Sequence, residues 1–228
     1  MFHLYAKWAM RSLGVEPKII KHNIPTSIEG ALFVSNHVSY LDMPLLASLY
    51  PVTFVSTVEF KQIGFFGHFA SLLNCIIIER RSFAKLKNEI SQIEAALYQG
   101  ENVLFFPESR ATDGMNILPF KRPFFIPAEL KNRDVIAYTI QYESINGENI
   151  TLQNKDKIYW YWQTPLFKHI LKLIESKKIA VTIYMELIRA KDYSFDGDGV
   201  KLAQVARQVV LKNWRPLSNK NHIASSSS

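Results

Sequence analysis

The sequence of 228 residues contains a single cysteine, Cys75, which cannot form a disulfide within the chain. A reducing compartment is therefore expected, and the apolar run 72–78 around Cys75 predicts a buried strand residue. The chain also lacks Cys and His residues at the spacing of a zinc site, and it lacks a glycine-rich loop of the kind that binds phosphate. We accordingly expect no metal, no cofactor and no cycle of nucleotide hydrolysis.

Long hydrophobic runs are missing as well. The longest uncharged stretch, residues 62–78, is shorter than the roughly 20 residues that a membrane-spanning helix needs, and polar residues interrupt it. The first residues have no continuous apolar core of the kind that directs secretion. We therefore expect any membrane attachment to be peripheral, on the cytoplasmic face.

Acidic residues are fewer than basic ones, with 20 Asp and Glu against 27 Lys and Arg, which gives a net charge of +7. This excess indicates an anionic partner, which charge alone leaves open between a phospholipid surface, a nucleic acid and a phosphate-bearing substrate. A hydrophobic content of 48% is enough for a full core. The length suits one domain covering residues 1–228, with a disordered tail at 225–228.

The first segment, residues 1–14, has the pattern of an amphipathic helix. Apolar and aromatic side chains alternate there with His3, Lys7 and Arg11, which recur every four residues on one side. Two interpretations remain open. The segment is either an interfacial helix that lies on a membrane or an ordinary helix that covers the core of the domain.

Strand-like and helical patterns alternate along the rest of the chain, which predicts an α/β fold with a mixed, mostly parallel sheet flanked by helices. The clearest helix covers residues 82–99, with Ser82 as its N-cap and Gly100 as its terminator. The other predicted elements are strands at 31–34, 102–106, 134–142, 157–161 and 179–187, and helices at 166–175 and 200–211.

Two polar motifs follow predicted strands. Asn36 and His37 come after the strand 31–34, with Asp42 five residues beyond His37, and the run Phe106-Pro107-Glu108 follows the strand 102–106. Open α/β sheets place their sites at the carboxyl ends of strands. The two motifs are therefore expected to share one catalytic site.

His37 is the expected base of this site. An imidazole has an unperturbed pKa of about 6.5, so it can take a proton near neutral pH. A carboxylate that accepts from one ring nitrogen fixes the tautomer and leaves the other nitrogen free. Asp42 is the expected carboxylate.

The combination of Asn-His-x4-Asp and Phe-Pro-Glu resembles the glycerolipid acyltransferase family, which acylates lysophosphatidic acid. Two further blocks of that family have counterparts here, the second at residues 54–59, 64–67 and 76–80 and the fourth at 118–122, so that all four occur in order between residues 30 and 142. The resemblance implies an O-acyltransferase that moves a fatty acyl group from acyl-CoA or an acyl-carrier protein to a lysophospholipid. The expected acceptor is 1-acylglycerol-3-phosphate at an anionic membrane surface, with no nucleic acid as partner.

The third block departs from the commonest family pattern, Phe-Pro-Glu-Gly-Thr-Arg-Ser. Here Ser109 stands at the glycine position, Arg110 is displaced by one position, and Asp113-Gly114 follows. The Asp-Gly pair is more similar to bacterial members of the family, some of which acylate other lyso-lipids. A different acceptor, such as a lyso-ornithine lipid, therefore stays open.

The resemblance also implies a set of substrate-binding residues, namely Asn36, Arg80, Glu108, Ser109, Arg110 and Lys121. Arg80, Arg110 and Lys121 are expected at the phosphate head group, since a guanidinium can give one phosphate two parallel donors; the alternative is that they are solvated surface cations. Glu108 is expected to position substrate or, alternatively, to hold the Phe-Pro turn together. Asn36 is also expected to orient the His37 loop.

Two further roles are expected close to His37. Backbone N–H groups at the start of the helix after His37, or at Ser109, are candidates for stabilising the oxyanion of the tetrahedral intermediate. The hydroxyl of Ser39 is expected to cap that helix rather than to take part in the chemistry.

Two rival functions come from other classes. A thioesterase or phospholipase would use a nucleophilic serine with His37 and Asp42, but the chain has no Gly-x-Ser-x-Gly elbow. A nonenzymatic basic protein that binds membranes would explain the net charge and the amphipathic start. It would leave the ordered set of four blocks unexplained.

Overall fold

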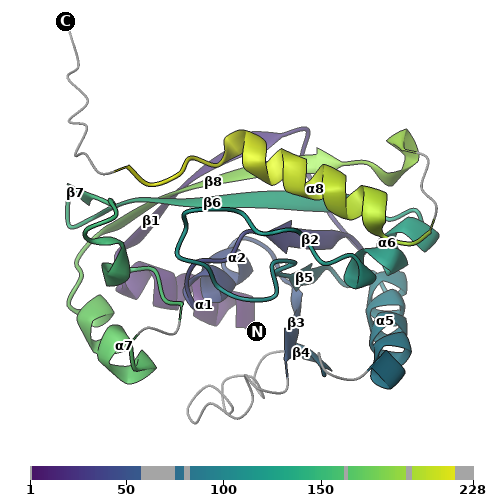
Figure 1. The fold of residues 1–228 in the computed structure, drawn as a ribbon, viewed down its shortest axis with the longest axis horizontal. Helices are drawn as coiled ribbons and strands as arrows, with labels where there is room; N and C mark the ends of the chain where they lie inside the picture. Colours follow the sequence, from purple (N-terminus) through teal and green to yellow (C-terminus); the bar gives the residue numbers. More distant parts are fainter. Residues whose placement is uncertain (1, 58–74, 80–82, 162–163, 194–196, 219–228) are drawn as a thin grey trace, which may run out of the picture.

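The computed structural model describes residues 2–57, 75–79, 83–161, 164–193 and 197–218. Its strands form one eight-stranded sheet in the order β1-β8-β6-β2-β5-β3-β4, with β7 paired to β6 (Figure 1). The strands are β1 (Val15–His22), β2 (Leu32–Ser35), β3 (Thr53–Thr57), β4 (Cys75–Ile78), β5 (Val103–Phe105), β6 (Val135–Ile145), β7 (Glu148–Asn149) and β8 (Ile179–Ile188).

The sheet is mixed and mostly parallel, as the sequence predicts. Five pairings are parallel, between β1 and β8, β2 and β5, β2 and β6, β3 and β4, and β3 and β5. β6 runs antiparallel to both β7 and β8. The carboxyl ends of β2 and β5 therefore lie side by side at one edge of the sheet.

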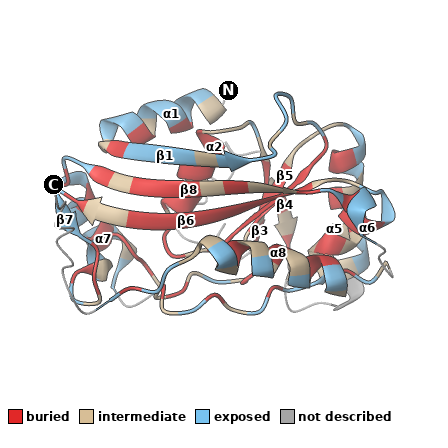
Figure 2. Ribbon diagram, turned by 90° about the horizontal axis from the view of Figure 1, so that it is seen from above, coloured by how far each residue is buried: buried red, intermediate tan, exposed pale blue. Residues whose placement is uncertain are grey.

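Helices cover both faces of the sheet, and Figure 2 shows α1 and α8 on opposite sides of it. The α-helices are α1 (Phe2–Ser12), α2 (Asp42–Ala47), α5 (Phe83–Tyr98), α6 (Ile126–Leu130), α7 (Leu166–Ile174) and α8 (Val200–Asn213). Short 3-10 helices cover Pro123–Phe125, Lys155–Lys157 and Ala190–Asp192. Among the helices that the structure describes, none combines the length and the apolar content needed to cross a bilayer.

The core has two halves, one on each face of the sheet. Along β2, Leu32 and Val34 point into the cluster that contains residues of α5, α6 and α8, whereas Phe33 points into the cluster that contains residues of α1 and α2. A strand that is covered on both faces is apolar at every position. This explains the uninterrupted apolar run that precedes His37.

The end of α5 follows the sequence prediction. Gly100 has a φ of 84°. Its N–H donates to the carbonyl of Leu97, and the N–H of Glu101 donates to the carbonyl of Ala96. This is the Schellman arrangement, in which a glycine in the left-handed region ends a helix. The predicted N-cap, Ser82, lies outside the described residues.

Two sequence predictions about strands are corrected. The segment 157–161 is not a strand: the 3-10 helix Lys155–Lys157 leads into irregular backbone. There Ile158 accepts from the Ser39 hydroxyl and the N–H of Trp160 donates to Val38, so the segment packs across the His37 loop instead of joining the sheet. Cys75 does begin a strand, β4, but it is half-buried rather than buried.

Candidate active site

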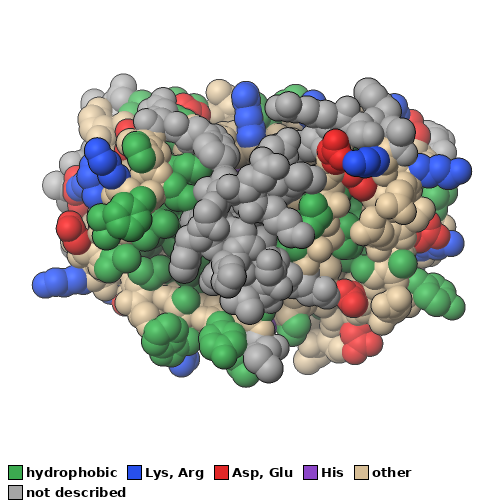
Figure 3. Space-filling model, turned by 90° about the horizontal axis from the view of Figure 1, so that it is seen from below, with side chains coloured by type: hydrophobic (Ala, Val, Ile, Leu, Met, Phe, Trp, Pro, Cys, Tyr) green, Lys and Arg blue, Asp and Glu red, His purple; other side chains and the backbone are tan. Residues whose placement is uncertain are grey.

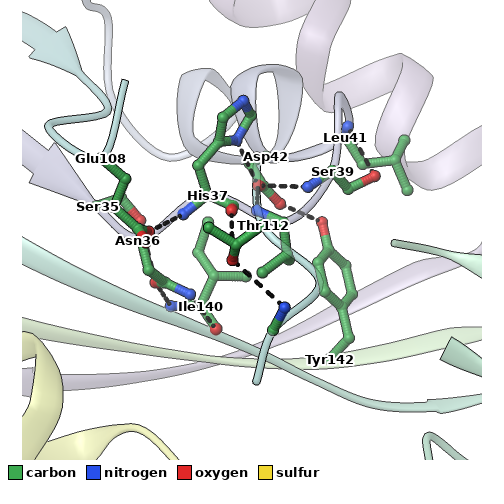
Figure 4. A network of polar contacts seen from close by, with 12 residues as sticks. Ser35, Asn36, His37, Ser39, Leu41, Asp42, Glu108, Thr112, Ile140 and Tyr142 are labelled. Atoms are coloured by element: carbon green, nitrogen blue, oxygen red, sulfur yellow. Dashed lines mark hydrogen bonds and ion pairs between the residues drawn. The ribbon is translucent and has the colours of Figure 1, made fainter. Parts of the chain in front are cut away.

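The first and third sequence blocks meet at the carboxyl ends of two adjacent strands. β2 and β5 are parallel neighbours, with Val34 opposite Phe105. Each strand is followed directly by its motif, and Figure 4 shows His37, Asp42 and Glu108 in one hydrogen-bonded network. The structure therefore brings the two motifs together, and their shared role in catalysis stays a prediction.

Asn36 fastens the start of the His37 loop to β6. Its side-chain amide donates from Nδ2 to the carbonyl of Ile140 at 3.0 Å, and its Oδ1 accepts from the N–H of Ile140 at 2.8 Å. The side chain is buried. Because the Ile140 backbone uses both polar ends of the amide, the geometry favours the loop-orienting role of Asn36 over substrate binding.

The carboxylate of Asp42 is the centre of the network. Oδ2 lies 2.8 Å from His37 Nδ1, and it accepts the N–H groups of Val38 at 2.7 Å and Ser39 at 2.9 Å. Oδ1 accepts the hydroxyl of Tyr142 at 2.9 Å. Four donors thus satisfy a carboxylate that is fully buried, which removes the cost of leaving it unpaired.

The imidazole of His37 is fixed on one side and open on the other. With Nδ1–H donating to Asp42, the tautomer has a free lone pair on Nε2, which forms no hydrogen bond with the described part of the chain. The ring stacks on Phe106, with centroids 4.1 Å apart and planes at 15°. The side chain keeps 17% of its surface exposed, so Nε2 is able to accept a proton from a substrate hydroxyl.

Glu108 holds two loops together. Oε1 accepts the N–H of His37 at 2.9 Å and Oε2 accepts the N–H of Leu118 at 2.7 Å. Burial raises the pKa of Glu108 to about 7, while the N–H groups of Leu118 and His37 act in the opposite direction. The geometry therefore favours the turn-holding alternative for Glu108, extended to the His37 loop itself.

The third block also binds the other backbone group of His37. The N–H of Thr112 donates to the carbonyl of His37 at 2.8 Å, and the N–H of Gly114 donates to the Thr112 hydroxyl at 3.3 Å. Both backbone groups of His37 are thus held by residues 108–112. The residues that position the catalytic loop thus lie at least 71 residues after His37 in the sequence.

Four of the expected oxyanion donors are already occupied. The N–H groups of His37, Val38 and Ser39 donate to Glu108 and Asp42. The N–H of Ser109 donates to the carbonyl of Phe106 at 3.0 Å. In this conformation of the loop these four N–H groups are engaged within the chain, and the identity of the oxyanion donors stays a prediction.

Ser39 does not cap α2, contrary to the sequence prediction. The N-cap position is Leu41, and no side chain caps the helix. The Ser39 hydroxyl donates to the carbonyl of Ile158 at 2.7 Å and accepts from the N–H of Leu41 at 3.3 Å. Ser39 therefore ties the His37 loop to the segment that crosses it.

The predicted head-group cations are only partly placed by the structure. Arg110 and Lys121 are exposed, and their charged groups form no hydrogen bond or ion pair within the described ranges. The N–H of Lys121 donates to the carbonyl of Pro107 at 2.9 Å, which joins the fourth block to the third. Arg80 lies outside the described residues. Binding of a phosphate by these three residues stays a prediction, as does binding by Ser109, which is half-buried with a φ of 66°.

Sequence reasoning missed Tyr142 and Thr112. Tyr142 ends the predicted strand 134–142, and nothing within that stretch sets its hydroxyl apart from those of Tyr138 and Thr139. Its partner, Asp42, is 100 residues away, and only the pairing of β2 with β6 makes them neighbours. Within the described ranges no group of three His, Cys, Asp or Glu side chains is arranged to hold a metal ion.

A family model described as Acyltransferase matches residues 18–142, a range that contains His37, Asp42, Glu108 and Tyr142. A 1-acyl-sn-glycerol-3-phosphate acyltransferase of Neisseria gonorrhoeae is 26% identical over 159 residues, which cover 70% of this chain and 60% of the relative. A lyso-ornithine lipid O-acyltransferase of Brucella abortus (strain 2308) is 27% identical over 159 residues, which cover 67% of this chain and 60% of the relative. The chain thus spans about 60% of the length of these curated relatives.

One solved structure has a similar fold. The 1-acyl-sn-glycerophosphate (LPA) acyltransferase PlsC from Thermotoga maritima aligns with a TM-score of 0.60 and 18% identity. The alignment covers 92% of this chain and 77% of that chain. At this identity the likeness establishes the fold.

Proposed function

Since the chain belongs to the acyltransferase family, we propose that it transfers a fatty acyl group from acyl-CoA or an acyl-carrier protein to the free hydroxyl of a lysophospholipid. The observation that carries the proposal is the open Nε2 of His37, whose Nδ1 is held 2.8 Å from the buried Asp42 carboxylate. A base that is fixed on one side and accessible on the other is what direct attack by an alcohol requires.

In the proposed reaction, Nε2 of His37 takes the proton of the acceptor hydroxyl as its oxygen attacks the carbonyl carbon of the thioester. Asp42 stabilises the imidazolium that forms. When the tetrahedral intermediate collapses, the carbon–sulfur bond breaks and the imidazolium returns the proton to the leaving thiolate. The products are a diacyl lipid and a free thiol, and no acyl-enzyme forms.

The acceptor proposed first is 1-acylglycerol-3-phosphate, with its phosphate bound by Arg80, Arg110 and Lys121. A lyso-ornithine lipid is the second candidate. It is favoured by the Asp113-Gly114 pair in the third block and by the likeness to lyso-ornithine lipid acyltransferases. Both acceptors present one free hydroxyl on an acylated lipid, so His37 would act in the same way on either.

We propose that the reaction takes place at the cytoplasmic face of a membrane, where the protein binds peripherally. The net charge of +7 favours anionic lipid. On α1 three large side chains, Leu4, Tyr5 and Trp8, are exposed, whereas Ala6 and Met10 are buried. This pattern supports the interfacial interpretation of the first helix.

The test measures thiol release from a long-chain acyl-CoA, with and without each lyso-lipid, and identifies the lipid product by mass. The variant His37→Ala should lower acceptor-dependent release by about a hundredfold or more, since general-base catalysis contributes about 100-fold to 10,000-fold. The matched control is His22→Ala, which removes an exposed histidine on the edge strand β1. It should leave the rate unchanged.

The outcomes distinguish between the candidate acceptors, donors and reactions. Release that depends on one lyso-lipid identifies the acceptor, whereas release without any acceptor favours a thioesterase. Full turnover by His37→Ala would remove His37 as the base. If acyl-CoA gives no release and an acyl-carrier protein does, the donor is the carrier protein.

A further inference from the structure

The helix α7 (Leu166–Ile174) presents apolar side chains to solvent. Phe167 is 71% exposed, Leu171 48% and Ile174 60%, although all three belong to types that are usually buried. They lie three or four residues apart, so they form one stripe along the helix. His169 and Leu173 are the buried residues of α7 and point to the other side. The outward surface of this helix is therefore apolar, which is the reverse of an ordinary surface helix.

Basic side chains border this stripe. Lys168 and Lys172 are exposed and lie four residues apart, so they form a second row next to Phe167 and Leu171. Neither ammonium group forms an ion pair within the part of the chain that the structure describes. An apolar stripe with a cationic border is the arrangement of a helix that lies in the plane of an anionic bilayer.

We propose that α7 is a docking helix that inserts Phe167, Leu171 and Ile174 into the surface of an anionic lipid bilayer. Lys168 and Lys172 lie at the level of the lipid head groups and add an attraction that salt weakens. The proposal rests on the proposed membrane-surface function for the identity of the partner. The binding site itself does not depend on the chemistry at His37.

The position of α7 in the molecule supports a flat lipid partner. Figure 3 shows hydrophobic side chains gathered on one side of the lower face, where α1 and α7 lie. The exposed apolar residues of these helices are Leu4, Tyr5 and Trp8 on α1 and Phe167, Leu171 and Ile174 on α7. Two amphipathic helices on one face can contact a plane together.

α7 is also connected to the catalytic loop. The ring nitrogen Nδ1 of His169 and the hydroxyl of Tyr40 share a hydrogen bond of 2.9 Å, and the two rings meet edge to face at 5.4 Å. Tyr40 lies between His37 and Asp42 in the sequence. Docking of α7 therefore brings lipid to the side of the catalytic loop.

The experiment measures sedimentation of the full chain with vesicles of phosphatidylcholine containing about one third phosphatidylglycerol, without any acyl donor. The double variant Phe167→Ser/Leu171→Ser should bind about tenfold or more weakly, because two large side chains no longer enter the apolar layer. The matched control is Tyr98→Ser, which removes an exposed aromatic side chain from α5, on a different side of the molecule from α7 (Figure 1). It should bind as the unchanged protein does.

A second pair of measurements tests the lysines. Lys168→Gln/Lys172→Gln should weaken binding to the anionic vesicles and reduce its salt dependence, with no effect on vesicles of phosphatidylcholine alone. Circular dichroism checks that every variant is folded; since all the changed side chains are exposed, the folds should be retained. Equal binding by all variants would overturn the proposal.

Other partners appear as distinct outcomes. If the serine variant keeps vesicle binding but loses binding to an acidic acyl-carrier protein, α7 is a protein-docking helix and the proposal is wrong. If the unchanged protein is a dimer that the serine variant dissociates, the stripe is a contact between two copies, which also overturns it. Thiol release on detergent-dispersed substrates is measured separately, so a loss of docking and a failure of the acyltransferase proposal are distinguished.

Discussion

At the scale of single residues, the site consists of one reacting side chain and several that hold it. His37 presents Nε2, while Asp42 receives four hydrogen bonds and Glu108 two. The pairing of His37 with Asp42 follows from sequence because five residues separate them, so one loop brings them together. The partners of Glu108 and Tyr142 were not predictable, since their contacts depend on which strands are neighbours.

Two tyrosines of β6 offer a matched test of the Asp42 network. Tyr142 and Tyr138 are both buried, but the hydroxyl of Tyr142 donates to Asp42, whereas that of Tyr138 has no hydrogen-bond partner among the residues that the structure describes. Tyr142→Phe should lower the free energy of unfolding by about 1–3 kcal/mol, because it leaves one oxygen of a buried carboxylate without a donor. Tyr138→Phe should be neutral or stabilising.

Urea denaturation of both variants measures this difference, and the thiol-release rate reports on the site. Tyr142→Phe should also lower kcat, because Asp42 would hold His37 less firmly, and Tyr138→Phe should leave kcat unchanged. Equal loss of stability in the two variants would show that packing of the ring, and not the hydrogen bond to Asp42, is what matters at these positions.

At the scale of elements, the N-cap residue of α8 is Gly199, which has no side chain that could cap the helix. A carboxylate from another helix takes that place. Glu129 of α6 is buried and accepts the N–H of Gly199 at 2.8 Å and that of Leu202 at 3.3 Å. The first N–H groups of a helix have no partners within it. A carboxylate at this position accepts hydrogen bonds from them and interacts favourably with the helix dipole.

Replacement of Glu129 should therefore destabilise α8. Glu129→Ala is expected to lower the free energy of unfolding by about 1–2 kcal/mol, the usual cost of losing a helix cap. The control is Glu29→Ala, which removes an exposed carboxylate. Urea denaturation followed by circular dichroism checks both variants. If the two behave alike, the contact between α6 and α8 contributes nothing measurable to stability.

Most helices and strands can be predicted from the sequence because the signals that define them lie within each element. The apolar spacing and the final glycine of α5, and the continuous apolar runs of β2 and β5, depend on residues close in sequence. The edge strand β1 has no such signal, because Val15 is its only fully buried residue. The segment 157–161 has strand-like residues but is held by Val38 and Ser39, and those contacts are invisible in its own sequence.

At the scale of the whole molecule, the order of the strands assembles the site. β2 lies between β5 and β6, so the loop that carries His37 meets Glu108 on one side and Tyr142 on the other. The sequence predicts that strands deliver these motifs to one edge of a sheet, but not which strands are adjacent. A property that depends on the assembled sheet is therefore the most direct test of this arrangement.

The pH dependence of global stability is such a property. Burial raises the pKa of Glu108 to about 7 in the folded protein, whereas a glutamate in an unfolded chain has a pKa of about 4.3. Between these values the folded state holds a proton that the unfolded state has released. The contribution of Glu108 to the free energy of unfolding is therefore fully present at low pH and is lost as the pH rises through about 7.

Glu108→Gln removes this titration and serves as the reference. The free energy of unfolding of the unchanged protein minus that of Glu108→Gln should decrease by about 2–3 kcal/mol between about pH 5 and about pH 8. Urea denaturation at each pH measures it, with Glu29→Gln as an exposed control that should give no such slope. Parallel pH profiles for the unchanged protein and Glu108→Gln would mean that Glu108 is charged throughout, because the N–H groups of His37 and Leu118 outweigh its burial.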